Sequence, residues 1–184
     1  MADPMDEARA AVANLADTDE DDLYRLLALR MKTLERDPAI AGQFAPPTIA
    51  ATELGIAMPD LHALGRKLFE NIARAGQSII CGTDSEAGFH LQRLLSSVNM
   101  DITTVTAGVA TLLVGQLAIA PAVAGIVAAI VVGKVAPNSV EALCAAWTKK
   151  LGPVPVPGTG TLEPGTGAPE PTSMPPTSAP PATA

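Results

Sequence analysis

The hydrophobic pattern of this chain is dominated by one uncharged run. From Ile102 to Gly133 the sequence contains no charged residue, and Asp101 and Lys134 flank the run. A helix on a protein surface needs a polar face, and this segment offers almost none. The run is therefore expected to be buried, either within protein or in a lipid bilayer.

Amphipathic helices are predicted on both sides of this run, because apolar residues recur there three or four positions apart. The predicted helices extend from Pro4 to about Ala16, from Thr18 to Asp37, from Pro59 to Gly76 or slightly beyond, from the Thr83 and Glu86 pair through Val98, and from Asn138 to about Leu151. Three of them begin with a sequence that matches the capping pattern: Thr18 to Asp21, Thr83 to Glu86, and Asn138 to Glu141. Residues 39–57, with two adjacent prolines and Gly55, are expected to be irregular.

These segments predict an all-α fold, a bundle of six or seven helices with a central apolar helical hairpin. From Gly152 onward the composition changes to Pro, Gly, Thr, Ser and Ala with two acidic residues. Such a segment cannot bury enough apolar surface to offset the entropy lost on ordering. We therefore predict a helical domain over residues 1–151 and a disordered C-terminal tail over residues 152–184.

Pro121 divides the uncharged run into two predicted helices. At about 1.5 Å per residue, residues 102–120 would span about 28 Å and residues 122–135 about 21 Å. A short link at Ala120 and Pro121 would place the helices antiparallel, so the sequence predicts an apolar hairpin over residues 102–135. The first helix approaches the roughly 30 Å thickness of a bilayer core, and the second is short for a crossing.

Small residues four positions apart form a strip on each hairpin helix, and such strips let two backbones approach closely. Gln116 needs a hydrogen-bond partner or a wet surface, because an unpaired buried amide costs about a few kcal/mol. Lys134 and Trp147 would suit a membrane interface. The residues predicted to contact a membrane or a partner are Ala107, Thr111, Gly115, Gln116, Gly125, Ala129, Gly133, Lys134 and Trp147.

Two functional interpretations of the hairpin follow. In the first, the hairpin inserts into a membrane, as its uncharged length and its glycine strips favour. In the second, the hairpin is the core of a soluble helical domain, as its short second half favours. Both can hold for one protein in two states. That layout is similar to the layout of pore-forming colicins, in which amphipathic helices shield an apolar hairpin until it inserts.

Composition and charge narrow the classes of function. The net charge of −7 argues against nucleic-acid binding, because no basic stripe is available to replace phosphate counterions. Aromatic residues make up only 3% of the chain, so the core must be built from Ala, Val, Leu and Ile. The acidic N-terminal segment predicts no signal peptide, and therefore a cytoplasmic protein that can associate with the cytoplasmic membrane. The excess of Ala, Gly, Pro and Val suits a GC-rich bacterial genome.

The sequence offers no convincing catalytic or metal-binding constellation. His62, Cys81, His90 and Cys144 have no spacing typical of a zinc site, and a cysteine paired with one of the histidines would be an isolated signal for a hydrolase. The carboxylates from Asp19 to Asp22 are explained by the positive end of a helix dipole. We therefore expect no catalytic, cofactor-binding or metal-binding residues. Cys81 and Cys144 are expected to be small buried apolar groups.

The sequence thus predicts a non-enzymatic, membrane-active or membrane-anchored helical protein that acts through its hairpin. The alternative is a soluble helical adaptor, or an accessory subunit of a bacterial multi-component system for defence or secretion, with the hairpin in its own core or against a partner. The expected partners are membrane lipid or another protein, including a second copy of the chain. No cofactor is expected.

Overall fold

The computed structural model describes residues 4–47, 50–82, 86–96, 101–133 and 139–152. All of them belong to one compact unit, residues 1–153. The predicted tail from residue 153 onward, and Lys134 and Val135 at the end of the predicted hairpin, lie outside the described residues.

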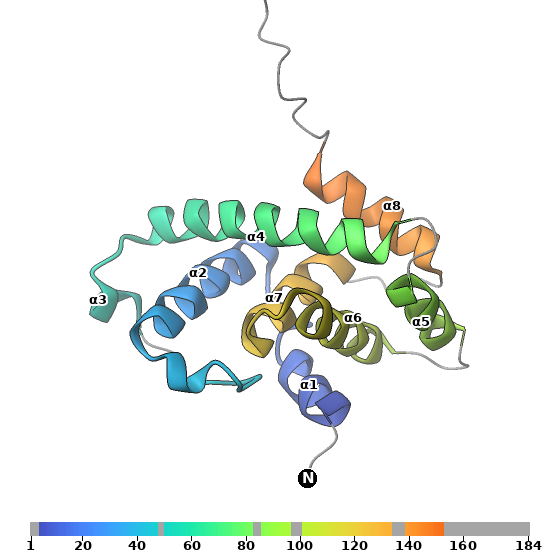
Figure 1. Ribbon diagram of the computed structural model, residues 1–184. Helices are drawn as coiled ribbons and strands as arrows, with labels where there is room; N and C mark the ends of the chain where they lie inside the picture. Colours follow the sequence, from blue (N-terminus) through green and yellow to red (C-terminus); the bar gives the residue numbers. More distant parts are fainter. Residues whose placement is uncertain (1–3, 48–49, 83–85, 97–100, 134–138, 153–184) are drawn as a thin grey trace, which may run out of the picture. The chain divides into compact units, whose positions relative to one another are not determined.

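The described residues form eight α-helices and one short 3-10 helix, and no strand occurs among them, which confirms the all-α fold (Figure 1). The prediction of six or seven helices omitted one four-residue helix, α3, in a region expected to be irregular. The α-helices are α1 (Pro4–Ala13), α2 (Glu20–Arg36), α3 (Ala51–Leu54), α4 (Met58–Ile80), α5 (Glu86–Leu95), α6 (Ile102–Leu117), α7 (Pro121–Val132) and α8 (Val140–Leu151).

The uncharged run forms the predicted helical hairpin, with α6 and α7 in contact. Both helices are shorter than expected. Helix α6 stops at Leu117 because Ala118 adopts a left-handed conformation with φ of 51°. Pro121 is the first residue of α7 and not part of the link, in keeping with the preference of proline for the first helical turn. Gly133 ends α7 with φ of 66°.

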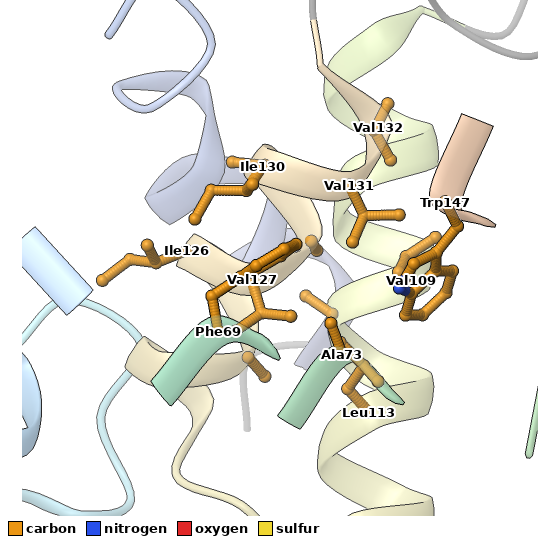
Figure 2. Close-up of a cluster of buried hydrophobic side chains, with 14 of the residues drawn as sticks. Phe69, Ala73, Val109, Leu113, Ile126, Val127, Ile130, Val131, Val132 and Trp147 are labelled. Atoms are coloured by element: carbon orange, nitrogen blue, oxygen red, sulfur yellow. The ribbon is translucent and has the colours of Figure 1, made fainter. Parts of the chain in front are cut away.

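Helix α7 lies at the centre of the domain, and every residue from Ala122 to Val132 is buried. It contacts α1, α2, α4, α6 and α8. Figure 2 shows Phe69 of α4, Val109 of α6 and Trp147 of α8 among the side chains that surround it. The second half of the uncharged run is therefore buried within this domain.

Helices α1 and α4 lie on opposite sides of the hairpin (Figure 1). Helix α4 also packs along α2, and this contact is close because Gly65 of α4 lies directly against the backbone of Tyr24. Gly76, further along α4, lies against the side chains of Leu113 and Trp147. Both glycines leave room for a neighbouring helix that a larger residue would displace.

Two of the predicted helix starts are wrong in detail. The first residue of α2 is Glu20, and the hydroxyl of Thr18 donates to the carbonyl of Asn14 instead of capping α2. Helix α8 is capped by Ser139, whose side chain accepts from the N–H of Ala142 at 3.1 Å. For α8 a neighbouring residue with similar chemistry provides the cap, whereas the N-cap position of α2, Asp19, makes no side-chain capping bond. Capping patterns locate a helix start only to within a residue or two.

Candidate membrane or partner-contact site

The turn of the hairpin carries the most exposed part of the uncharged run. We call residues 112–121 the hairpin tip. Gly115, Gln116 and Ala118 are exposed, and most of the other tip residues are partly exposed. Leu113 is buried beneath them. The tip is thus an uncharged surface that continues directly from the buried part of the hairpin.

One residue of each small-residue strip lies against α1. Ala107 is fully buried and packs in one cluster with Ala8 and Val12 of α1. A methyl group at Gly125 would meet the Val12 side chain at 3.5 Å, an ordinary contact distance. The small residues therefore allow a third helix to lie against the hairpin, a role that the sequence had not distinguished from contact between α6 and α7.

The remaining predicted contact residues are scattered. The hydroxyl of Thr111 donates to the carbonyl of Ala107 at 2.9 Å, within its own helix. Gln116 lies at the surface, where water can hydrate its amide. Trp147 has no exposed surface, so in this structure it contacts neighbouring helices and does not lie at an interface with solvent or lipid. Lys134 lies outside the described residues.

Ala129 and Gly133 line a cavity of about 630 Å³ at the end of the hairpin opposite the tip. Five helices contribute to its wall: the end of α1, the beginning of α2, the beginning of α6, the end of α7 and one face of α8. Most of the lining side chains are apolar. The polar side chains among the lining residues are Thr18, Glu20, Thr106 and Lys150.

The two charges at this cavity pair with each other. The Lys150 ammonium of α8 forms an ion pair with the Glu20 carboxylate of α2. The other Glu20 oxygen accepts from the Tyr24 hydroxyl at 2.9 Å. Burial, together with this hydrogen bond, raises the pKa of the Tyr24 phenol. Glu20 thereby connects α8 to α2.

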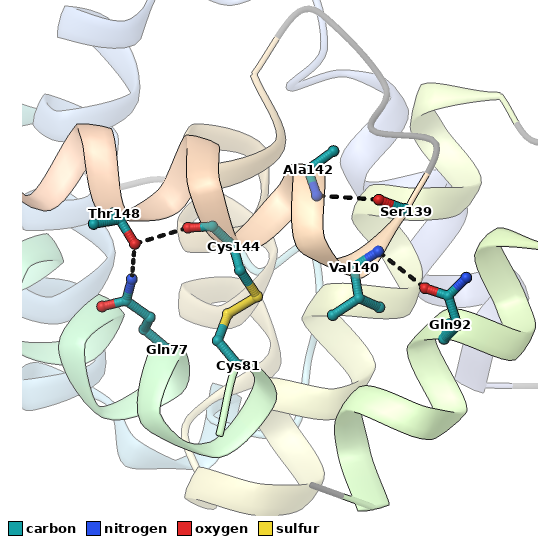
Figure 3. The surroundings of a disulfide bond; sticks show 8 residues. All are labelled: Gln77, Cys81, Gln92, Ser139, Val140, Ala142, Cys144 and Thr148. Atoms are coloured by element: carbon teal, nitrogen blue, oxygen red, sulfur yellow. Dashed lines mark hydrogen bonds between the residues drawn. A yellow bond between two sulfur atoms is a disulfide. The ribbon is translucent and has the colours of Figure 1, made fainter. Parts of the chain in front are cut away.

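Cys81 and Cys144 form a disulfide bond, and their Cα atoms are 5.8 Å apart (Figure 3). The expectation that they are unpaired apolar groups is wrong. The bond joins the C-terminal end of α4 to α8, two elements that the packing brings together across 63 residues of sequence. Because both sulfurs are engaged, neither is a thiolate nucleophile or a metal ligand in this state.

Polar contacts from the side chains of other helices also hold α8 in place. The Gln77 amide donates to the Thr148 hydroxyl at 2.7 Å, and the backbone N–H of Val140 donates to the Gln92 side chain at 3.1 Å (Figure 3). Together with the disulfide, these bonds fix the helix that supplies one wall of the cavity.

The histidines and acidic residues that the structure describes form isolated pairs. His62 pairs with Asp21 at 3.2 Å, and His90 pairs with Glu86 in the next turn of its own helix at 3.6 Å. Among the described residues, no group of three or more His, Cys, Asp or Glu side chains is placed to hold a metal ion. Asp22 of the acidic cluster is paired with Arg25.

Asp101 anchors the beginning of α6. Its carboxylate accepts from the backbone N–H of Thr104 at 2.7 Å, as an N-cap does. Hydrogen bonds from the side chain and the backbone of Thr104 lower the pKa of this carboxyl. The last charged residue before the uncharged run therefore also defines where its first helix starts.

Sequence reasoning missed two features of the structure. The cavity could not be found, because its wall needs five helices assembled. Phe89 of α5 is one of the few large apolar side chains exposed among the described residues, and it stands beside the apolar stripe predicted for that helix. An aromatic residue beside the stripe would have been the signal for it.

Within the residues that the structure describes, none of the helices combines the length and the apolar character that a membrane span requires. Comparisons with protein-family models, with curated protein sequences and with solved structures find no match for this chain.

Proposed function

We propose that the protein acts without catalysing a reaction, by bringing its apolar hairpin to a membrane, and that the structure represents a shielded form. The observation that carries the proposal is the hairpin tip. It places an uncharged, partly exposed surface at the end of a hairpin whose second helix is buried among the other helices. Such a surface can contact lipid before the rest of the hairpin is released.

The arrangement around the hairpin supports release. Helix α1 has ten residues and lies on the hairpin through small apolar contacts of Ala8 and Val12. Its ion pair, Arg9 with Asp6, lies within α1, and its charge interaction with the hairpin is a weaker one, between Arg9 and Asp101 at the start of α6. Helix α8, in contrast, is held by the disulfide. Helix α1 is therefore the cover that we expect to leave first.

Flotation with phosphatidylcholine vesicles tests the proposal. The double variant Gly115→Lys/Gln116→Lys adds two charges at exposed tip positions, and a side chain at Gly115 has open space around it. Inserting a lysine into hydrocarbon costs about 2.5–3.5 kcal/mol at the centre of a membrane helix. We expect vesicle binding to fall at least tenfold.

The matched control is Ala63→Lys/Ala75→Lys, which adds the same charges at exposed positions of α4. It should bind vesicles as the unchanged protein does. Hydrogen exchange in α7 reports release, because these buried amides should exchange faster with vesicles present. No flotation at pH 7 or pH 4.5, or equal loss in both variants, would contradict the membrane proposal.

Helix length favours a second candidate, a helical adaptor whose hairpin is only its own core. At about 1.5 Å per residue, the 16 residues of α6 span about 24 Å and the 12 of α7 about 18 Å, both below the bilayer core. An adaptor would stay off vesicles and keep α7 protected. It would instead bind a second copy of the chain or another subunit, for example in a bacterial defence or secretion system.

The disulfide bears on where either function takes place. Structural disulfides persist mainly in oxidising compartments, and they are rare in the reducing cytosol. The bond between Cys81 and Cys144 therefore favours an oxidising compartment over the cytoplasmic location expected from the sequence. Thiol labelling of protein isolated under acid quench measures whether Cys81 and Cys144 are oxidised in the native source. If they form the disulfide there, labelling should occur only after reduction.

A further inference from the structure

The cavity lies at the end of the hairpin opposite the tip. Its volume of about 630 Å³ falls within the range of small-molecule sites, about 300–1,000 Å³. The cavity is partly open to solvent, and most of its lining side chains are apolar, as in small-molecule sites. It is therefore a candidate binding site.

The wall of the cavity is suited to an alkyl chain. Ile130 and Val131 are almost completely buried, and Leu23 is only 4% exposed. Ala142 and Ala146, which are exposed, lie where α8 borders the cavity. The branched apolar side chains of the wall gain free energy when an alkyl chain replaces water against them.

The polar side chains of the wall favour a ligand without net charge. Glu20 and Lys150 neutralise each other as an ion pair, so an added carboxylate or ammonium would meet a like charge as well as an opposite one. A ligand ion would also lose its hydration on entering an apolar wall. Neither ionic form is therefore preferred by this site.

The two threonines favour a ligand that donates a hydrogen bond. The Thr106 hydroxyl donates to the carbonyl of Ile102 at 2.7 Å, and the Thr18 hydroxyl donates to the carbonyl of Asn14 at 3.3 Å. With their protons engaged, both oxygens retain lone pairs that can accept. A hydroxyl group on the ligand supplies the matching donor.

We propose that this cavity binds a neutral, single-chain amphiphile of the long-chain alcohol class. The alkyl chain lies against the apolar residues at the end of α7, and the hydroxyl donates to a threonine oxygen of the wall. The site is separate from the hairpin tip, because it is built from the beginning of α6 and the end of α7. The proposal does not depend on membrane insertion.

Calorimetric titration with 1-hexanol, 1-heptanol, 1-octanol and 1-nonanol tests the site. We expect saturable 1:1 binding whose dissociation constant falls about fourfold per added methylene, which corresponds to about 0.8 kcal/mol per buried methylene. Heats that do not saturate, or an affinity that is independent of chain length, would show that the alkyl chain does not bind in the cavity and would overturn the proposal.

Two neighbouring alanines of α8 provide a matched pair of variants. Ala146→Phe places a bulky side chain at the cavity and should weaken 1-nonanol binding at least tenfold. Ala145→Phe adds the same group at an exposed position outside the cavity lining and should leave binding unchanged. Equal effects in the two variants would overturn the assignment. Ala142→Phe is a second blocking variant, should Ala146→Phe fail to fold.

Charge selectivity is tested with nonanoate and nonylamine beside 1-nonanol. The alcohol should bind at least tenfold more tightly than either ion at pH 7. In Glu20→Gln, Lys150 loses its carboxylate partner, so nonanoate binding should strengthen at least tenfold. An unchanged protein that prefers an ion would refute the neutral ligand class. The tip variant Gly115→Lys/Gln116→Lys should bind the alcohol normally, which separates this site from the proposed membrane surface.

Discussion

Gly65 of α4 lies so close to Tyr24 of α2 that a methyl group at Gly65 would fall 1.7 Å from the Tyr24 carbonyl oxygen. The obstacle is backbone, which cannot rotate away as a side chain can. The separation of α2 and α4 along their contact is therefore set by the absence of a side chain at one position. Tyr24 in turn contacts the rings of His62 and Phe69, so the close approach also orders aromatic packing in the core.

Replacing Gly65 with alanine should destabilise the domain. Overpacking a well-packed interface costs about 1–3 kcal/mol and occasionally more, and here α2 and α4 would have to separate. Gly115→Ala is the control, since a side chain there meets nothing within 4 Å and should stabilise α6 by about 1 kcal/mol. Urea denaturation followed by circular dichroism measures both. A neutral Gly65→Ala would contradict the observed helix spacing.

Replacing Ala118 with glycine should stabilise the protein. Ala118 has a left-handed conformation with φ of 51°, the only positive φ at a non-glycine residue among those described. This conformation costs about 1–2 kcal/mol for a residue with a Cβ, and glycine adopts it freely. We expect a gain of about 1 kcal/mol in the free energy of unfolding. Ala63→Gly, within the exposed face of α4, should instead lose about 1 kcal/mol.

Loss of the disulfide should destabilise α8 against the rest of the domain. Cys81 and Cys144 are 63 residues apart, and cross-linking a loop of that length contributes roughly 4 kcal/mol in the chain-entropy account. Trp147, the single tryptophan of the chain, reports the transition by fluorescence. Dithiothreitol should lower the urea midpoint of the unchanged protein and should leave Cys81→Ser/Cys144→Ser unaffected. Equal midpoints before and after reduction would show that the bond adds no stability.

The start of α6 should lose stability in acid. Hydrogen bonds from Thr104 lower the pKa of Asp101 in the folded protein. A carboxyl whose pKa is lower in the folded than in the unfolded protein stabilises the fold at pH values above its unfolded pKa of about 4. This contribution is lost as the pH falls through the folded pKa. The stability difference between the unchanged protein and Asp101→Ala should therefore be largest at pH 7 and should shrink below about pH 4.

Asp101→Asn is the matched control for this titration. Asparagine keeps an oxygen acceptor for the Thr104 N–H but does not ionise between pH 3 and pH 7. Its stability difference from Asp101→Ala should change little across the same pH range. Parallel pH profiles for the unchanged protein and the Asp101→Asn variant would mean that the charge of Asp101 does not contribute.

Local chemistry made several features predictable from the sequence. The run after Asp101 was expected to be buried, because a long and mainly apolar segment offers no polar face with which a helix could lie at the surface. Pro121 marked the division of the run, and Gly152 marked the end of the last helix, where it adopts φ of 67°. These features depend on residues within a few positions of one another, so a linear pattern contains the information.

Other features depend on residues far apart in the chain, and no local pattern contained them. Cys81 and Cys144 pair because α4 and α8 lie together, and the spacing of two isolated cysteines does not reveal this. Trp147 precedes Lys149 and Lys150 in the sequence and was therefore predicted to lie at a membrane interface. The packing of α8 against α4 and α7 buries it instead. Gly125 lies beside Val12 of α1. A small residue accepts the close approach of any helix, so the sequence did not indicate that this helix would be α1.

The amino-acid order alone predicted that most of residues 102–133 avoid water, since every side chain in the run is uncharged and most are apolar. Which surfaces exclude the water followed from the packing of α1, α2, α4 and α8 around α7. The reason is physical: the hydrophobic effect is non-directional and names no partner, whereas shape, such as the missing side chain at Gly65, selects one.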